Sequence, residues 1–196
     1  EIIVVDNDSR ESRTKALFER VEAEESVRVI AQPGPFNFAA LINTGVASAR
    51  GNLVCLLNND VEITSPDWLR KMAALAVRED IGAVGARLLY PDGAIQHAGV
   101  ALGIGDAAGH VDKGVAPVPG EFAPWHDETR TVSAVTAACL LVSRAKFVEV
   151  GGMGDLEERA TDQVGGLAPE QLTDGRVARG DRPVGVEHRD AGGCVV

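Results

Sequence analysis

Two acidic residues, Asp6 and Asp60, each follow a short apolar run that is typical of a buried strand. Asp60 is preceded by Asn58 and Asn59, which continue directly from the apolar residues 53–57. A carboxylate at the carboxyl end of a buried strand stands where open α/β sheets bind ligands. Such hard oxygen ligands suit Mg²⁺ or Mn²⁺ holding a diphosphate. The same residues also form ordinary turns, and both interpretations stay open.

The first half of the chain alternates between strand and helix patterns. Strands are expected at 2–5, 27–30, 53–57 and 82–86, and helices between them, near 16–21, at 37–49 and from 66 onward. This alternation predicts an α/β fold with a mainly parallel central sheet flanked by helices, in a single domain. If the first and third strands are neighbours, Asp6 and Asp60 line one crevice.

Local signals mark where the helices begin. Asp8 and Glu11 have the spacing of a capping box before the first helix. Ser65 followed by Pro66 predicts a capped start for the third helix. Ser143 is expected to cap a short helix over 144–150, which Gly151 and Gly152 end.

The second half of the chain changes character. Two short strands are expected around the Pro91–Gly93 turn, and 131–142 returns to strand character. Between them, 103–131 is rich in Gly and Pro, as in a lid or a substrate-binding loop. Trp125 and His126 in that loop either contact a sugar or anchor the loop itself. Residues 154–196 have few apolar side chains, which predicts an atypical tail, disordered or non-native.

Composition excludes several classes of protein. A net charge of −10 argues against nucleic acid as the main partner, because such proteins need a basic face. No apolar run approaches the roughly 20 residues of a membrane helix. Three cysteines do not form an even set, and Cys55 and Cys139 lie in apolar runs, which favours core thiols in a reducing compartment.

The ordered set of motifs over about 1–153 resembles family 2 glycosyltransferases of GT-A fold, in the rhamnosyltransferase-like branch. The segments that carry the resemblance are 3–9, 36–45, 49–51, 56–60, 68–69, 90–93, 96–100, 135–139 and 151–153. The resemblance implies an inverting, metal-dependent transfer of a sugar from a UDP- or dTDP-linked donor to a glycan or lipid-linked acceptor, as in cell-wall or polysaccharide biosynthesis. It also implies a cytoplasmic location, including the inner face of the membrane.

The resemblance also assigns site residues position by position. The donor-binding residues would be Asp6, Asn43, Arg50, Asn58, Asn59, Thr136 and Ala137, and Asp60 would bind Mg²⁺ or Mn²⁺. Asn58 stands where the family's motif has an acid, which predicts weaker metal binding. His97 is a looser candidate near the donor, and a hydrogen-bonded core histidine is the alternative.

The chain departs from the family at both ends. The family's first strand is missing before Glu1, and its late acidic motif, which would hold the general base, is not recognisable near Glu158 or Asp162. No catalytic residue is therefore assigned, and we expect an inactive fragment that binds nucleotide weakly. The alternatives are a non-catalytic α/β binding or assembly module and, last, a nucleotidyltransferase. The open sheet edge also allows pairing with a second copy.

Overall fold

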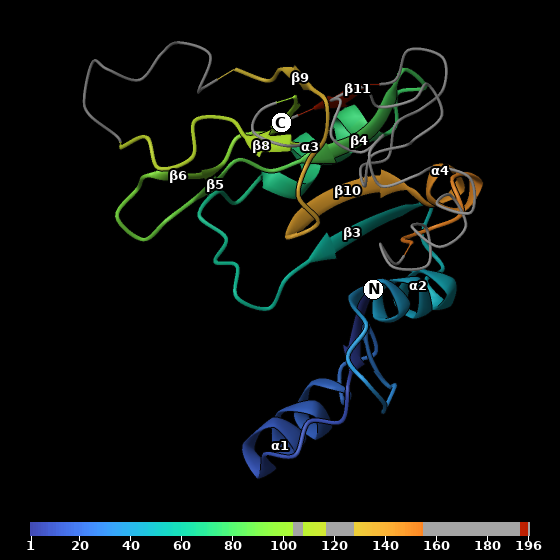
Figure 1. The fold of residues 1–196 in the computed structure, drawn as a ribbon. Helices are drawn as coiled ribbons and strands as arrows, with labels where there is room; N and C mark the ends of the chain where they lie inside the picture. The colour runs from blue at the N-terminus through green and yellow to red at the C-terminus, as the bar shows by residue number, and fades with distance from the viewer. Residues whose placement is uncertain (104–107, 117–127, 155–192, 196) are drawn as a thin grey trace, which may run out of the picture.

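The central sheet contains five strands in the order β3–β10–β4–β11–β9 (Figure 1). Their bounds are β3 (Leu53–Leu57), β10 (Cys139–Ser143), β4 (Ile81–Gly85), β11 (Gly193–Val195) and β9 (Thr131–Val132). This computed structural model describes residues 1–103, 108–116, 128–154 and 193–195. The α/β class is as expected, with helices and strands in alternation up to residue 85.

The direction of the strands differs from the expected mainly parallel sheet. β10 runs antiparallel to both β3 and β4, so those two strands point the same way but are not neighbours. β11 is parallel to β4 and antiparallel to β9. The sheet is mixed because an apolar run buried on both faces suits either direction of pairing, and only the long-range register decides between them.

The strands β1 (Ile2–Asp6) and β2 (Val27–Ala31) form a separate parallel pair. In Figure 1 this pair lies on one side of α2 (Phe38–Ser48), and the five-stranded sheet lies on the other side. The helix is close to β1, because a Cβ added to Gly45 would lie 3.3 Å from Val5 Cγ2. None of the residues in β1 and β2 is fully buried, so the expected burial of 2–5 is only partial.

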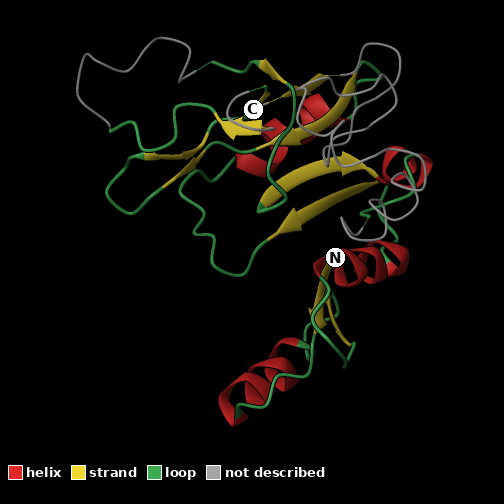
Figure 2. Ribbon diagram, in the orientation of Figure 1, coloured by secondary structure: helices red, strands yellow, loops and turns green. Residues whose placement is uncertain are grey.

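Helices cover both faces of the five-stranded sheet, as Figure 2 shows. Successive side chains of a strand point to opposite faces. On one face α2 and α4 (Arg144–Glu149) pack on the sheet, through a cluster that includes Val46, Val54, Leu56, Ala83, Val142 and Phe147. On the other face α3 (Trp68–Ala76) packs on it, through Met72, Ala76, Val84, Cys139 and Leu141 among others. The result is a three-layer α/β/α arrangement.

Two predicted helix starts need correction. Asp8 has a left-handed backbone (φ 65°) and pairs with Arg10, while Glu11 is the residue before α1 (Ser12–Val21), so the capping box does not form. Ser65 donates a hydrogen bond to Asp67, and α3 begins after Asp67, because residues 65–68 form a turn first.

The other helix boundaries agree better with the sequence. Asn37 caps α2 by accepting a hydrogen bond from the backbone N–H of Ala40 at 2.8 Å. Ser143 precedes α4 but makes no side-chain capping bond. Gly151 and Gly152 both have positive φ, which ends that helix as predicted.

Two hairpins follow β4. β5 (Leu88–Leu89) and β6 (Ile95–His97) pair antiparallel around the predicted turn, where Gly93 has φ 85° and Asp92 accepts a hydrogen bond from the N–H of Ala94. β7 (Val100–Leu102) and β8 (Ala108–His110) form the second hairpin, and β8 lies inside the stretch 103–131 that was expected to be a loop. Trp125, His126 and nearly all of the predicted tail lie outside the described residues. No helix in the described part has both the length and the apolarity needed to cross a membrane.

Candidate functional site

The end of β3 meets the loop that leads into β10. Because these strands are antiparallel, Cys139 at the start of β10 pairs with Leu57 at the end of β3. The pairing continues one step further, since the backbone N–H of Asn58 donates to the carbonyl of Ala138 at 2.9 Å. The structure therefore brings Asn58, the first of the predicted residues 58–60, to Ala138, which directly follows the predicted residues 136–137.

The residues at the end of β3 are open to ligands. Asn58 is half-buried, and Asn59 and Asp60 are exposed. Among the described residues, no three His, Cys, Asp or Glu side chains form a group that could hold a metal ion. One carboxylate beside amide oxygens is a donor set that fits Mg²⁺ or Mn²⁺, because such ions are commonly bound by one or two carboxylates together with substrate phosphates. The metal assignment of Asp60 remains a prediction.

Thr136 is fixed by its own backbone and side chain. Its Oγ1 accepts a hydrogen bond from the N–H of Ala138 at 3.3 Å, and its N–H donates to His97 Nε2 at 3.3 Å. Ala137 packs against the core cluster under α2 and α4. Two hydrogen bonds and one apolar contact therefore fix the loop before β10.

His97 is a buried histidine with both ring nitrogens in use. Only 1% of its surface is exposed, and its Nδ1 lies 3.0 Å from His110 Nδ1. The two rings meet edge to face, at a centroid distance of 5.0 Å and an interplanar angle of 79°. Burial, and then the neighbouring His110, lower the pKa of His97 to about 4. The structure thus agrees with the alternative of a hydrogen-bonded core histidine.

The hydrogen bonds assign the protons on this pair of histidines. Because the N–H of Thr136 must donate, His97 Nε2 carries no proton and Nδ1 carries one. The Nδ1 proton then points to His110 Nδ1, which must accept. Sequence reasoning did not single out His110, because nothing in its neighbourhood in the sequence indicates a contact with His97.

Asp6 ends a strand of the other sheet. Its Oδ1 accepts a hydrogen bond from the N–H of Ser9 at 3.0 Å, which is the turn geometry weighed as an alternative. β1 and β3 are not hydrogen-bonded to each other, so strand pairing does not bring Asp6 beside Asp60.

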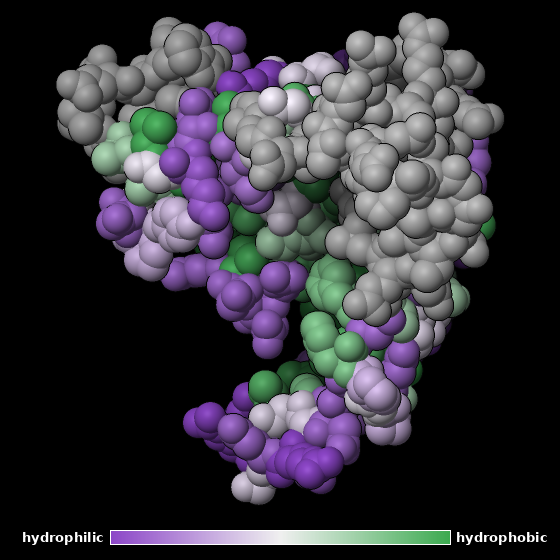
Figure 3. Space-filling model, in the orientation of Figure 1, coloured by the Kyte–Doolittle hydropathy of each residue, from purple (hydrophilic) through white to green (hydrophobic). Residues whose placement is uncertain are grey.

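Figure 3 shows a hollow, with apolar residues along it, between the part that contains α1, β1 and β2 and the part that contains the five-stranded sheet. The loop after β3, drawn in teal in Figure 1, lies on the upper side of that hollow.

Arg50 lies at the other end of β1 from Asp6. Its N–H and Nε donate to the carboxylate of Glu1 at 2.6 and 3.2 Å, and Arg28 binds the same carboxylate at 2.9 Å. The backbone N–H of Arg50, followed by the side chain of Arg28, lowers the pKa of Glu1 to about 2. The rise of a strand puts Glu1 roughly 16 Å from Asp6, so the structure does not bring Arg50 to Asp6.

Asn43 binds the backbone of Met153 and lines a cavity of about 340 Å³ between α2 and α4.

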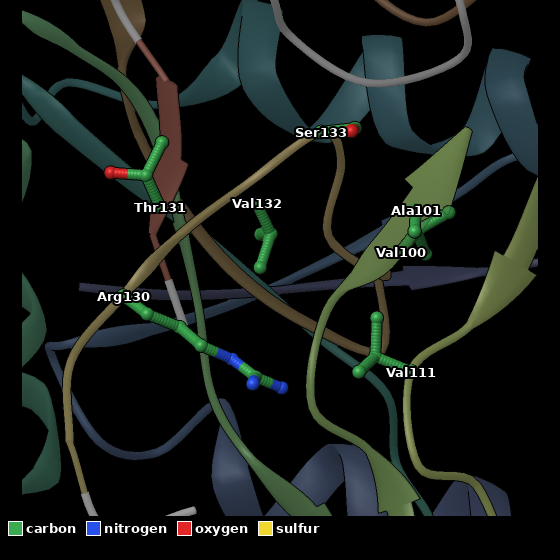
Figure 4. A pocket seen from close by; sticks show the side chains of 7 residues that line it. All are labelled: Val100, Ala101, Val111, Arg130, Thr131, Val132 and Ser133. Atoms are coloured by element: carbon green, nitrogen blue, oxygen red, sulfur yellow. The ribbon is translucent and has the colours of Figure 1, made fainter. Parts of the chain in front are cut away.

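A larger cavity, of about 460 Å³, lies between three parts of the chain: β7, the turn that follows β8, and β9 (Figure 4). It is lined by Val100, Ala101, Val111, Arg130, Thr131, Val132 and Ser133, and Arg130 Nη2 donates to the carbonyl of Ala98 at 2.7 Å. No predicted site residue lines this larger cavity.

The arrangement of strands and helices defines a GT-A-like α/β protein. A structure of similar fold is a mannosyltransferase from Pyrobaculum calidifontis in complex with GDP-Man and Mn²⁺, with a TM-score of 0.52 and 15% identity. The match covers 79% of this chain and 38% of that one.

The model of glycosyl transferase family 2 matches residues 1–151, so the chain belongs to this family. The uncharacterized protein y4gI of Sinorhizobium fredii is 48% identical over 161 residues. The O-antigen biosynthesis protein RfbC of Myxococcus xanthus is 36% identical over 159 residues. These alignments cover 80% and 79% of this chain, but only 17% and 12% of the two relatives, so the chain spans less than a fifth of either protein.

Proposed function

We propose that this chain is the donor-binding part of an enzyme that transfers a sugar from a nucleotide-diphosphate donor to an acceptor hydroxyl, with inversion and with a divalent metal. The observation that carries the proposal is the hydrogen bond between Asn58 and Ala138, which connects the segments that hold the predicted residues 58–60 and 136–137, in a family 2 chain. The GDP-Man and Mn²⁺ bound by the mannosyltransferase of similar fold support a donor of this class. The O-antigen relative supports a glycan or lipid-linked acceptor.

Each residue would act through its own chemistry. Asp60 would hold Mg²⁺ or Mn²⁺, which when bound neutralises the charge that builds on the leaving diphosphate. The amides of Asn58 and Asn59 would donate hydrogen bonds to phosphate or sugar oxygens. Thr136 and Ala137 would line the donor sugar with a backbone that is already fixed, which limits the loss of conformational entropy on binding. Asp6 would contact the base or the ribose.

Deprotonation of the acceptor hydroxyl needs a carboxylate within hydrogen-bond reach of it. The sequence offered only Glu158 and Asp162 for this purpose, and both lie outside the described residues.

Isothermal titration with UDP, dTDP and GDP, each with and without Mn²⁺, tests the donor site. We expect at least one nucleotide to bind, in a manner that needs Mn²⁺, and with an affinity weaker than micromolar. Asp60→Ala should abolish the effect of Mn²⁺. Glu62→Ala removes an exposed carboxylate two residues further on and should leave binding unchanged. If no nucleotide binds, or if Asp60→Ala binds as the wild type does, a non-catalytic α/β module is the better interpretation.

A further inference from the structure

We propose that His97 is a positioning residue for the donor site, acting through the backbone of Thr136 and Ala138; this inference rests on the proposed function. His97 comes from β6 and belongs to none of the elements that carry the predicted donor residues. Three hydrogen bonds connect it to the end of β3. The N–H of Thr136 donates to His97 Nε2, the N–H of Ala138 donates to Thr136 Oγ1, and the N–H of Asn58 donates to the carbonyl of Ala138.

The acceptor on His97 lies inside the protein. The imidazole is 1% exposed and Thr136 is half-buried, so the bond between them is shielded from much of the solvent. A buried donor without an acceptor costs about 1–3 kcal/mol, and the loop can avoid that cost only by moving. Movement at Thr136 would reach Asn58 through Ala138, because the hydrogen bonds are consecutive.

His110 contributes by fixing the proton on His97. It accepts at Nδ1 from His97 Nδ1–H, so the unprotonated nitrogen of His97 faces Thr136. A metal ion shared between the two Nδ1 atoms would require a different arrangement. Metal at Nδ1 of a neutral imidazole leaves the proton on Nε2, which would then face the N–H of Thr136 as a second donor. The geometry therefore fits a positioning pair better than a metal site.

Two substitutions of His97 distinguish the effect of losing the hydrogen-bond acceptor from the effect of changing the volume of the side chain. His97→Gln keeps an oxygen that can accept near the position of Nε2, whereas His97→Leu keeps an apolar side chain and loses the acceptor. Gln96→Ala is the matched control, because Gln96 is the neighbouring residue of β6 and is exposed. The first measurement is hydrogen exchange of individual backbone amides by NMR, which needs no ligand. We expect His97→Leu to speed exchange at Thr136 and Asn58 about tenfold, and His97→Gln to restore slow exchange.

The second measurement is the affinity for the nucleotide and Mn²⁺ that bind the wild type. We expect His97→Leu to weaken it about tenfold and His97→Gln to stay within about threefold. Unchanged exchange, or a His97→Leu variant that binds like the wild type, overturns the inference. If the wild type binds no nucleotide, the proposed function fails, and the exchange measurement still decides whether His97 holds the loop. Should His97→Leu not fold, His97→Asn gives the same test, because its amide oxygen lies near the position of Nδ1 and does not reach the position of Nε2. Unchanged exchange at Thr136 in that variant overturns the inference as well.

Discussion

The side chain of Asn43 binds the backbone of Met153 with both halves of its amide. Nδ2 donates to the Met153 carbonyl at 2.7 Å, and Oδ1 accepts from the Met153 N–H at 2.9 Å. The two residues are 110 positions apart, so this contact attaches the chain after α4 to α2.

Replacement of Asn43 by Ala should leave both backbone groups of Met153 without partners. We expect a loss of about 2 kcal/mol in the free energy of unfolding, measured by urea denaturation at pH 7. Asn52→Ala is the control, since Asn52 is exposed, and it should change stability by less than about 0.5 kcal/mol. Equal stability of the two variants would contradict a stabilising contact at Asn43.

Gly99, in the turn between β6 and β7, should not tolerate a side chain. Its φ is +100°, and an added Cβ would lie 2.5 Å from Val132 Cγ1. Gly99→Ala should therefore cost about 3 kcal/mol, as the sum of backbone strain and steric overlap. Gly114 has a similar φ of +83° with nothing within 4 Å, so Gly114→Ala should cost only the backbone part, about 1 kcal/mol. Thermal unfolding of both variants checks the difference, and equal costs would argue against the close approach of Val132.

Lys146 connects α4 to the turn between α3 and β4. Its ammonium group donates to the carbonyls of Arg78, Glu79 and Ile81 at 2.9, 3.0 and 2.5 Å. Hydrogen bonds from a charged group contribute more than neutral ones, so Lys146→Met should cost about 2 kcal/mol in urea denaturation. Lys71→Met removes an exposed ion pair with Asp67 and should cost less than about 0.5 kcal/mol. The prediction fails if the two variants are equally stable.

The stability of the fold should depend on pH through His97. Its pKa is lowered to about 4 from 6.5, so the unfolded chain binds more protons than the folded one between these values. The stabilisation is therefore complete above about pH 6.5 and is lost as the pH falls toward 4, by roughly 3 kcal/mol in total.

Denaturation of the wild type and of His97→Gln at pH 7, 6, 5 and 4 measures this dependence. Between pH 7 and pH 4 the free energy of unfolding of the wild type should fall by about 3 kcal/mol more than that of His97→Gln, because only the wild type carries a group that takes up a proton on unfolding in this range. Acidic groups with lowered pKa, such as Glu1, Asp67 and Asp80, are present in both proteins and cancel in the comparison. Parallel curves would show that His97 does not titrate in this way.

Most of the elements could be predicted from the sequence, whereas their pairing could not. The apolar run 53–57 and the periodic helix after Asn37 are encoded locally, and both form where expected. The direction of β10 depends on the alignment of Cys139 with Leu57, a contact between residues more than 80 positions apart. The capping box does not form because Asp8 adopts a left-handed backbone conformation, which the spacing of Asp8 and Glu11 cannot predict.

For the candidate site as well, the sequence suggested residues but not the partners that they contact in the folded chain. Asn58 and Thr136 were expected near the donor, and the antiparallel pairing connects their two segments through Ala138 although the expected sheet was parallel. Arg50 contacts Glu1 and Asn43 contacts Met153, which the sequence did not predict because only the folded chain supplies these partners. Their assignment to the donor site stays a prediction. Whether Asp6 contacts a donor stays a prediction.

The position of β10 between β3 and β4 has a consequence for synthesis on the ribosome. β3 and β4 end by residue 85, but the strand that joins them is complete only at residue 143. For about sixty residues of translation, both strands have emerged without the partner that joins them, and exposed strand edges readily pair with other chains. We therefore expect chaperones that bind nascent polypeptides to protect this chain mainly during that interval.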